Sequence, residues 1–312
     1  MKIYLAPLEG ITNYVYRKAL FECFDGFDKY FIPFIRAKQN LNLSGREKKD
    51  LLPENNEGMY AVPQILTKKA EDFIRTLELL SEYGYQEVNL NLGCPSKTVV
   101  TKGCGAGFLD RPEELERFLD EIFAKCNIQI SVKTRLGMED ASGFPELMKL
   151  YNKFPMKELI IHPRVQKDFY KNTPNLEMFA EAFAMSTNPV CYNGDIFCVE
   201  DHQRICERFP ELDAVMSGRG TLTNPALARE IRGGQALTKA ELRKFHDLVY
   251  HTYRAEVSGD RNVLFKMKEL WFYMGPLFAN NKKYLKKIKK SEKCIVYESA
   301  VAELFSNEEL IL

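Results

Sequence analysis

The chain has 312 residues, and its 44 lysines and arginines nearly balance its 43 aspartates and glutamates, which gives a net charge of +1. This balance excludes a uniformly basic nucleic-acid-binding protein, although it leaves room for one basic face on an otherwise acidic chain. Hydrophobic residues at 45% and charged residues at 28% exclude wholesale disorder and are typical of a globular protein with a large core.

Cysteine spacing and the N-terminal residues bear on metals and on location. The eight cysteines form no Cys-x-x-Cys pair, and the chain has only four histidines, so we expect no metal site. The first residues show no charged segment followed by a long apolar stretch, and no apolar run reaches membrane-spanning length. We therefore expect a cytoplasmic protein that does not contact membranes, and we expect it to be a monomer.

Short apolar segments rich in strand-forming residues alternate with helical stretches over the first 235 residues. Amphipathic helical spacing is clearest over 68–84 and 112–125. Strands that alternate with helices predict parallel βαβ units, and eight such units favour an α/β fold of the (β/α)8 TIM-barrel type over a doubly wound open sheet. The eight expected strands are 2–6, 30–35, 60–65, 86–91, 128–133, 157–161, 188–192 and 213–217.

The pattern changes after residue 235, where only helices are expected. We predict two domains, a catalytic barrel over 1–235 and an all-helical domain over 236–312. Residues 261–293 hold ten basic and two acidic residues, a net charge of +8, which leaves −7 for the rest of the chain. Trp271 lies within this basic segment, and we expect it in the core. The four expected helices are 238–257, 262–276, 279–290 and 293–305.

Unusual polar residues fall where the expected strands end. In a barrel, the loops that follow the carboxyl ends of the strands carry the chemistry. Core packing does not explain polar residues at the same edge of so many strands, so we expect the active site there. The residues are Glu9, Gln64, the segment 91–96, the segment 133–135, the segment 162–164, the segment 193–195 and the segment 218–220.

Glycine-rich turns follow the last two strands, at Asn193-Gly194-Asp195 and Gly218-Arg219-Gly220. Such turns expose backbone N–H groups to an anion, and a helix N-terminus and an arginine would add positive charge. This is the usual phosphate position in barrels of this type. The alternative is two ordinary tight turns and a surface arginine.

Lys133 and His162 are expected to point into the barrel mouth, where positive charge would stabilise an electron-rich ring such as a reduced flavin. Gln64 offers both a donor and an acceptor to a pyrimidine-like edge. The alternative interpretation makes His162 a half-buried structural histidine and Gln64 an amide that caps the backbone.

Cys94 lies between a glycine and a proline, so its loop is permissive on one side and stiff on the other. A thiol held there can act as a proton donor or as a nucleophile. The other seven cysteines are expected to be structural. The glycine-rich segment 103–107 lacks the G-x-G-x-x-G spacing, so we expect no Rossmann-type dinucleotide site.

Seven motifs in order resemble the tRNA-dihydrouridine synthases, and the resemblance runs from residue 2 to about residue 276. It implies an FMN-dependent oxidoreductase that reduces the C5–C6 double bond of particular uridines in tRNA, with NADPH as the electron source. Leu8 and Pro163 depart from the family pattern, which commonly has Met and Gly there. The motifs are APLEGITN, PQI, NLNLGCPSKTVVTKGCGAGFL, SVKTRLG, IHPR, NGD and SGRG.

The resemblance also implies roles for single residues. Cys94 matches the family's proton donor to C5, while hydride passes from the flavin to C6. Residues near the bound uridine or RNA would be Arg36, Asn91 and Arg135. The residues matched to FMN contacts are Pro7, Leu8, Glu9, Gln64, Lys133, His162, Asn193, Gly194, Asp195, Gly218 and Arg219.

The basic helical segment is expected to bind RNA, because neutralised phosphates release counterions. Its candidate contacts are Lys266, Lys268, Lys282, Lys283 and Lys286. Three alternatives stay open: a flavin barrel dehydrogenase acting on a free pyrimidine, a dihydrouridine synthase acting on rRNA, and an RNA-binding protein without catalysis.

Overall fold

The computed structural model describes residues 1–40 and 42–311, which form two compact units. The first unit comprises 1–7, 28–195 and 204–216, and the second comprises 8–27, 196–203 and 217–312. The predicted domain boundary at residue 235 stays a prediction about which parts fold independently.

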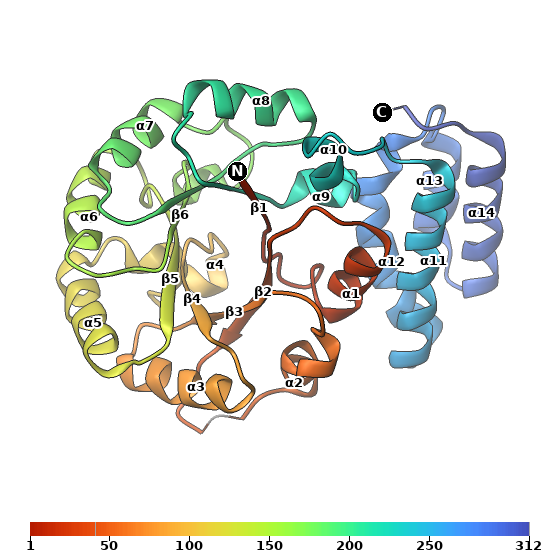
Figure 1. Ribbon diagram of the computed structural model, residues 1–312. Coiled ribbons are helices and arrows are strands. Elements are labelled where there is room, and N and C mark those ends of the chain that lie inside the picture. The colour runs from red at the N-terminus through yellow and green to blue at the C-terminus, as the bar shows by residue number, and fades with distance from the viewer. Residues whose placement is uncertain (41, 312) are drawn as a thin grey trace. The chain divides into compact units, whose positions relative to one another are not determined.

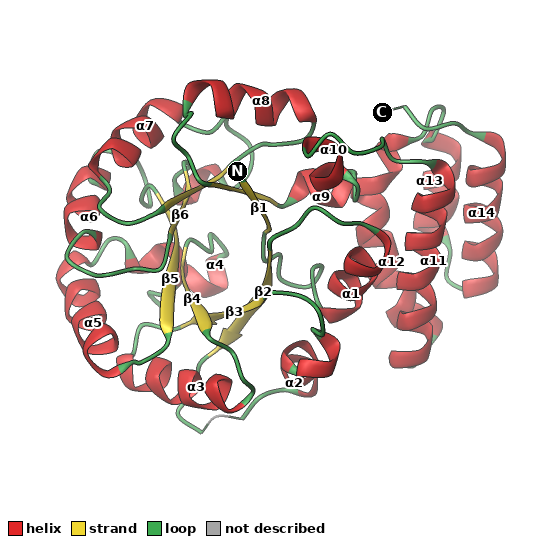
Figure 2. Ribbon diagram, viewed as in Figure 1, coloured by secondary structure: helices red, strands yellow, loops and turns green. Residues whose placement is uncertain are grey.

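The first unit is built on a closed barrel of parallel strands that pair in chain order from β1 to β8 (Figures 1 and 2). Within the described residues each strand begins and ends within two residues of its expected position. This confirms the TIM barrel, and the doubly wound open sheet is wrong because the strands close in sequential order. The strands are β1 (Lys2–Leu5), β2 (Lys29–Arg36), β3 (Ala61–Leu66), β4 (Glu87–Leu92), β5 (Gln129–Arg135), β6 (Leu159–His162), β7 (Val190–Asn193) and β8 (Ala214–Ser217).

Helices follow the strands, and Figure 1 shows α3, α5, α6 and α7 ringed around the barrel. Helix α5 (Pro112–Lys125) begins with proline at its first position and buries an apolar stripe of Leu115, Phe118, Leu119 and Ile122. The other helices along this part of the chain are α2 (Gly45–Leu51), α3 (Ala70–Glu82), α4 (Lys97–Val100), α6 (Phe144–Tyr151), α7 (Leu176–Met185) and α8 (Val199–Arg208), with short 3-10 turns at 53–55, 105–108 and 166–168.

The barrel interior is filled by side chains that point inward from successive strands. The members of this buried cluster are Tyr4, Ala6, Phe31, Val62, Ile160, Cys191, Ala214 and Met216. Cys191 is fully buried within it, which fits the expectation of a structural thiol.

The amino-terminal end of the barrel holds a buried ionic cluster. Lys29 Nζ lies 2.9 Å from Glu87 Oε2 and 3.6 Å from Glu158 Oε2. Tyr4 donates its hydroxyl to Glu158 at 2.8 Å, and Tyr60 donates to Glu87 at 3.1 Å. Burial raises the pKa of Glu158, which Lys29 partly offsets. This cluster lies at the end of the barrel that is normally structural rather than catalytic.

The second unit is helical. Helix α1 (Tyr14–Cys23) packs on α11 (Lys239–Glu256), where the ring of Phe245 contacts the rings of Tyr16 and Phe24 at centroid distances of 5.4 and 5.8 Å. Thr238 and Glu241 form a capping box at the start of α11. The remaining helices are α9 (Arg219–Thr223), α10 (Leu227–Ile231), α12 (Asp260–Met274), α13 (Lys282–Lys290) and α14 (Cys294–Asn307), and α11 to α14 match the four expected helices.

The core of α11 to α14 contains a polar network inside an aromatic cluster. Trp271 Nε1 donates to the Tyr297 hydroxyl at 2.8 Å, and that hydroxyl lies 2.6 Å from His246 Nε2. All three side chains are buried, so the expectation that Trp271 lies in the core is confirmed. Among the described residues, no helix is long and apolar enough to cross a membrane.

Candidate functional site

Side-chain hydrogen bonds connect the three neighbouring strands β3, β4 and β5. Gln64 Nε2 donates to Asn89 Oδ1 at 2.8 Å, and Asn91 Nδ2 donates to Gln64 Oε1 at 2.6 Å. Asn89 in turn donates to Ser131 Oγ at 3.0 Å. Gln64 is buried, so its position and orientation are fixed by the two asparagines before any ligand binds.

The same asparagine holds the loop of Cys94. Asn91 Oδ1 accepts hydrogen bonds from the backbone N–H groups of Gly93 at 3.1 Å and Cys94 at 2.9 Å. Gln166, which follows β6, donates to the carbonyl of Pro95 at 2.8 Å. The Cys94 thiol is therefore presented at the carboxyl end of β4 by a loop fixed on both sides.

The glycine-rich segment after Cys94 has a packing role. Gly105 has a φ of +56°, and a Cβ there would lie 2.8 Å from the Cys94 carbonyl oxygen. A Cβ on Gly107 would lie 2.7 Å from the Val100 carbonyl oxygen. Ala106 N–H donates to the Cys94 carbonyl at 3.1 Å. The close approach of two backbones explains these glycines without a dinucleotide.

Arg135 connects two loops through three hydrogen bonds. Its side chain is buried and donates to the backbone carbonyls of Gly93 at 2.9 Å, Val165 at 3.0 Å and Phe169 at 2.8 Å. The guanidinium carbon also lies 5.4 Å from the ring of Tyr170. Arg135 therefore fixes the loops after β4 and β6, and contact with a uridine stays a prediction.

Lys133 lies on β5 opposite Asn91 in the sheet register. Burial lowers the pKa of Lys133 to about 7, and the positive charge of Arg135 acts in the same direction. A lysine with this pKa can gain or lose a proton near neutral pH. Its response to a charged ligand is therefore larger than that of a surface lysine.

His162 ends β6, and it contacts the buried guanidinium of Arg164. Arg164 Nη1 lies 3.0 Å from His162 Nε2. Asp195, just after β7, accepts from Arg164 Nη1 at 3.0 Å and from Nη2 at 2.5 Å. His162 and Asp195, two predicted flavin contacts, therefore both contact the Arg164 side chain.

The turn after β7 is tightly packed. Asn193 Nδ2 donates to the Met216 carbonyl at 2.8 Å, which links the ends of β7 and β8. A Cβ on Gly194 would lie 2.0 Å from the Tyr192 hydroxyl, so only glycine fits there. Pro7 follows β1 in the same unit.

Four residues matched to FMN contacts, Leu8, Glu9, Gly218 and Arg219, belong to the helical unit. Leu8 is held by a turn in which its N–H donates to Thr12 Oγ1 at 2.8 Å. The Arg219 guanidinium carbon lies 5.4 Å from the ring of Phe197. A shared site between these four residues and the barrel residues stays a prediction.

The candidate RNA contacts divide into two groups. Lys266 Nζ donates to the Gly10 carbonyl at 2.8 Å, and Lys268 Nζ donates to the Ser291 carbonyl at 2.5 Å, so both hold the helical unit together. Arg36 lies at the end of β2 with its guanidinium carbon 5.7 Å from the ring of Phe34. The exposed candidates are Lys282, Lys283 and Lys286 on α13.

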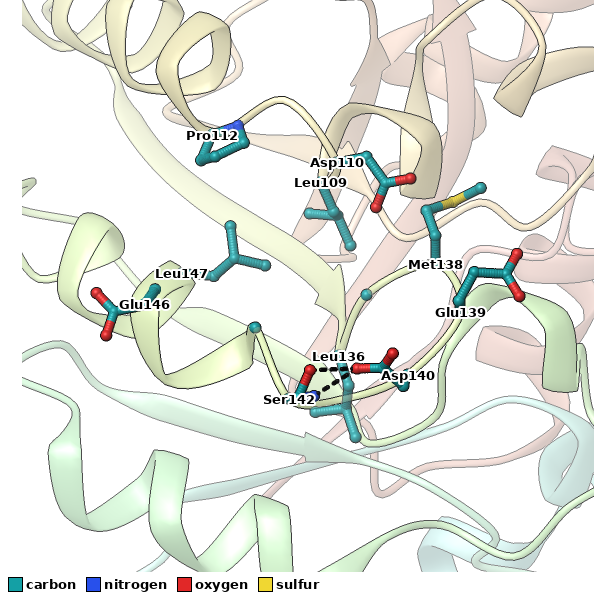
Figure 3. A pocket seen from close by; sticks show the side chains of 12 residues that line it. Leu109, Asp110, Pro112, Leu136, Met138, Glu139, Asp140, Ser142, Glu146 and Leu147 are labelled. Atoms are coloured by element: carbon teal, nitrogen blue, oxygen red, sulfur yellow. Dashed lines mark hydrogen bonds between the residues drawn. The ribbon is translucent and has the colours of Figure 1, made fainter.

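A cavity of about 340 Å³ opens between the loop that precedes α5 and the loop that follows β5 (Figure 3). Four carboxylates line it, from Asp110, Glu139, Asp140 and Glu146. Burial and the negative charges of Glu139 and Asp140 raise the pKa of Asp110. A cavity with this charge disfavours a phosphate, so it is not a candidate for the cofactor.

Comparison with known proteins decides the family. The model of the family described as "Dihydrouridine synthase (Dus)" matches residues 4–307. The chain belongs to the dihydrouridine synthase family. It is 31% identical over 240 residues to a tRNA-dihydrouridine(16) synthase of Cupriavidus necator, which covers 74% of each chain. A protein of the same name from Vibrio parahaemolyticus is 26% identical over 311 residues, which covers 94% of this chain and 93% of that one. The predicted family and class of enzyme are therefore confirmed.

Solved structures of similar fold agree with the barrel. A morphinone reductase structure matches with a TM-score of 0.56 at 10% identity, covering 78% of this chain and 88% of that one. A variant of NCR from Zymomonas mobilis matches with a TM-score of 0.53 at 14% identity, covering 78% and 90%. At these identities the likeness shows the fold alone.

The sequence placed Arg164 at the active-site edge without indicating its contacts, and it gave no role to Gln166 or Gly105. Arg164, Gln166 and Gly105 each fix a predicted site residue through a contact described above. One signal was present for Arg164, since an arginine two residues after a strand-end histidine lies in the same turn. The contacts of Gln166 and Gly105 join separate loops, so spacing along the chain carries no sign of them.

Proposed function

We propose that the protein reduces the C5–C6 double bond of a uridine in tRNA to 5,6-dihydrouridine, with FMN as its bound cofactor and NADPH as the electron source. The observation that carries this proposal is the Cys94 loop, held by Asn91 and Gln166 at the carboxyl end of the barrel strands beside Lys133. The names of the relatives from Cupriavidus necator and Vibrio parahaemolyticus support uridine 16 as the target.

The residues at this edge suit a flavin. Lys133 and His162 lie on the neighbouring strands β5 and β6, and the Gln64 amide is fixed on β3, which β4 joins to β5. Such a donor-rich set fits the electron-rich pyrimidine end of a flavin ring. Bound FMN would supply the hydride that goes to C6, and NADPH would restore its electrons. We propose that the turns 193–195 and 218–219 hold its ribityl chain and phosphate.

Cys94 would complete the reduction. Its Sγ donates a proton to C5 of the uridine, so that one hydride and one proton add across the double bond. The thiolate that remains interacts favourably with the charges of Lys133 and Arg135. Gly105 and Asn91 keep the thiol at one position, so little reorganisation accompanies the transfer.

The test uses purified protein, tRNA and NADPH, with dihydrouridine mapped by mass spectrometry. Cys94→Ala should keep visible flavin absorbance and lose about 10²- to 10⁴-fold in rate, the usual contribution of a general acid. Cys126→Ala, which removes a half-buried thiol elsewhere in the barrel unit, is the matched control. Full activity of Cys94→Ala would remove its assigned role. Modification of rRNA or of free uracil instead of tRNA would favour the alternative substrates.

We propose that α13 forms the RNA-binding surface together with α12. Tyr284 and Ile288 of α13 are buried, so the lysines of this helix face outward. On α12, Phe265 and Phe272 are 68% and 76% exposed and lie two turns apart on one face. Exposed aromatic rings beside lysines suit contact with both the bases and the phosphates of RNA.

Salt dependence tests this surface. Replacing Lys282, Lys283 and Lys286 by Gln should weaken tRNA binding and reduce the slope of log K against log salt by about 2, because each lost phosphate contact removes somewhat less than one unit. The control triple variant changes three exposed, ion-paired lysines of the barrel unit, Lys125, Lys149 and Lys153. An equal slope in both variants would place the RNA elsewhere.

A further inference from the structure

Arg164 is a buried and tightly held charged side chain at the carboxyl end of the barrel. It is 1% exposed, although it carries a permanent positive charge. Besides its contacts to His162 and Asp195, its Nε donates to the Asn172 carbonyl at 2.6 Å. Four of its five N–H donors therefore have partners.

The contact with His162 determines which imidazole nitrogen carries the proton. A guanidinium has donors and no acceptor, so the 3.0 Å contact between Arg164 Nη1 and His162 Nε2 is a hydrogen bond only if Nε2 offers a lone pair. A doubly protonated imidazole would turn an N–H toward the guanidinium and bring two positive charges together. The contact therefore requires a neutral imidazole with its proton on Nδ1.

We propose that Arg164 is a positioning residue that holds His162 as the neutral Nδ1–H tautomer, so that the imidazole presents a donor and no positive charge at the barrel mouth. In water the neutral histidine side chain favours the other tautomer, with the proton on Nε2. Arg164 reverses this preference by occupying the Nε2 lone pair. The mouth then contains one titratable cation, Lys133, and one neutral donor, rather than two cations.

Asp195 fixes the orientation of Arg164. Its two oxygens accept from Nη1 and Nη2 of Arg164, which fixes the plane of the guanidinium. The backbone N–H of Arg164 donates to the His162 carbonyl at 2.7 Å, so Pro163 lies within a closed turn. Asp195 therefore acts on His162 through Arg164.

Nitrogen NMR tests the tautomer directly. Protein labelled with ¹⁵N-histidine, purified with its cofactor at pH 7.5, gives long-range correlations that distinguish a protonated ring nitrogen from an unprotonated one. The chain has four histidines, and His162→Asn identifies the His162 signals by their loss. We expect His162 to show a protonated Nδ1 and an unprotonated Nε2. An imidazolium, or a proton on Nε2, would overturn the proposal without any variant of Arg164.

Two variants assign the cause. Arg164→Met removes the donor and should convert the His162 signals toward the Nε2–H form. Arg75→Met is the control, because Arg75 also pairs with a carboxylate, Asp72, but on helix α3. Unchanged His162 signals in folded Arg164→Met would contradict the role of Arg164. Absence of dihydrouridine formation with the Nδ1–H signals intact would overturn only the proposed function.

Discussion

Lys133 gives the sharpest prediction, because its protonation differs between the folded and unfolded chain. In the folded protein burial lowers the pKa of Lys133 to about 7, and within residues 1–40 and 42–311 no ion pair offsets the lost hydration. In the unfolded chain the group has its ordinary value of 10.5. The unfolded state therefore binds more protons between pH 7 and pH 10.5, and the contribution of Lys133 to stability increases with pH across this interval.

The size of the effect follows from the same two values. At pH 7 half of the folded molecules carry the proton, and at pH 9 almost none do, while the unfolded chain keeps it. At about 1.4 kcal/mol per pH unit for a full proton, the contribution of Lys133 increases by about 2 kcal/mol from pH 7 to pH 9. Lys133→Met has similar length and no charge, so it should lose this increase.

The assay is urea unfolding of cofactor-free protein at pH 7 and pH 9, for the wild type and for Lys133→Met. Tyrosines and cysteines also titrate in this range, so the difference between the two proteins is the relevant quantity. Lys149→Met, on an exposed lysine paired with Glu146, controls for the loss of a charge. If wild type and Lys133→Met show the same change between the two pH values, the lowered pKa of Lys133 is wrong.

Three further substitutions test packing and electrostatics. Tyr297→Phe should lower stability by about 1–3 kcal/mol, because Trp271 Nε1 loses its buried partner, as thermal unfolding would register. Lys29→Met should cost about 3–5 kcal/mol by leaving two buried carboxylates without their cation, which urea unfolding would measure, and the loss should shrink at lower pH because burial raises the pKa of Glu158. Gly105→Ala should destabilise by about 1–3 kcal/mol and slow dihydrouridine formation with flavin retained, because φ is positive and the new Cβ would displace the Cys94 loop. Normal turnover by Gly105→Ala would show that the position of the Cys94 loop does not control the rate of dihydrouridine formation.

The barrel was predictable from the sequence because its determinants are local. Each strand is a short apolar segment followed by polar residues, and each helix shows its own apolar stripe, so neither depends on distant partners. The strand-end positions of Gln64, Lys133 and His162 follow from the same pattern. Trp271 was assigned to the core for a similar reason, since large apolar rings on helices are usually buried.

Contacts across the fold were not predictable. Asn91 is predicted to lie near the substrate, and its sequence position does not show that its side chain joins Gln64 to the Cys94 loop, because sheet register brings together residues that are 27 positions apart. Residues 8–27 lie within the predicted barrel domain of 1–235, and their sequence does not show that Tyr16 and Phe24 pack on Phe245 of α11. Lys266 and Lys268 are predicted RNA contacts, and their sequence positions do not show that both ammonium groups donate to backbone carbonyls of the helical unit.

The basic side chains at the carboxyl end of the barrel differ in whether protein groups already neutralise or hydrogen-bond their charge. Arg135 is held by three backbone carbonyls, and Arg164 is neutralised by Asp195. Burial brings the pKa of Lys133 to about 7, so an anionic ligand would draw a proton onto it. The change in protonation on binding a charged ligand is therefore expected at Lys133, while the two arginines keep the loops of Cys94 and His162 at fixed positions.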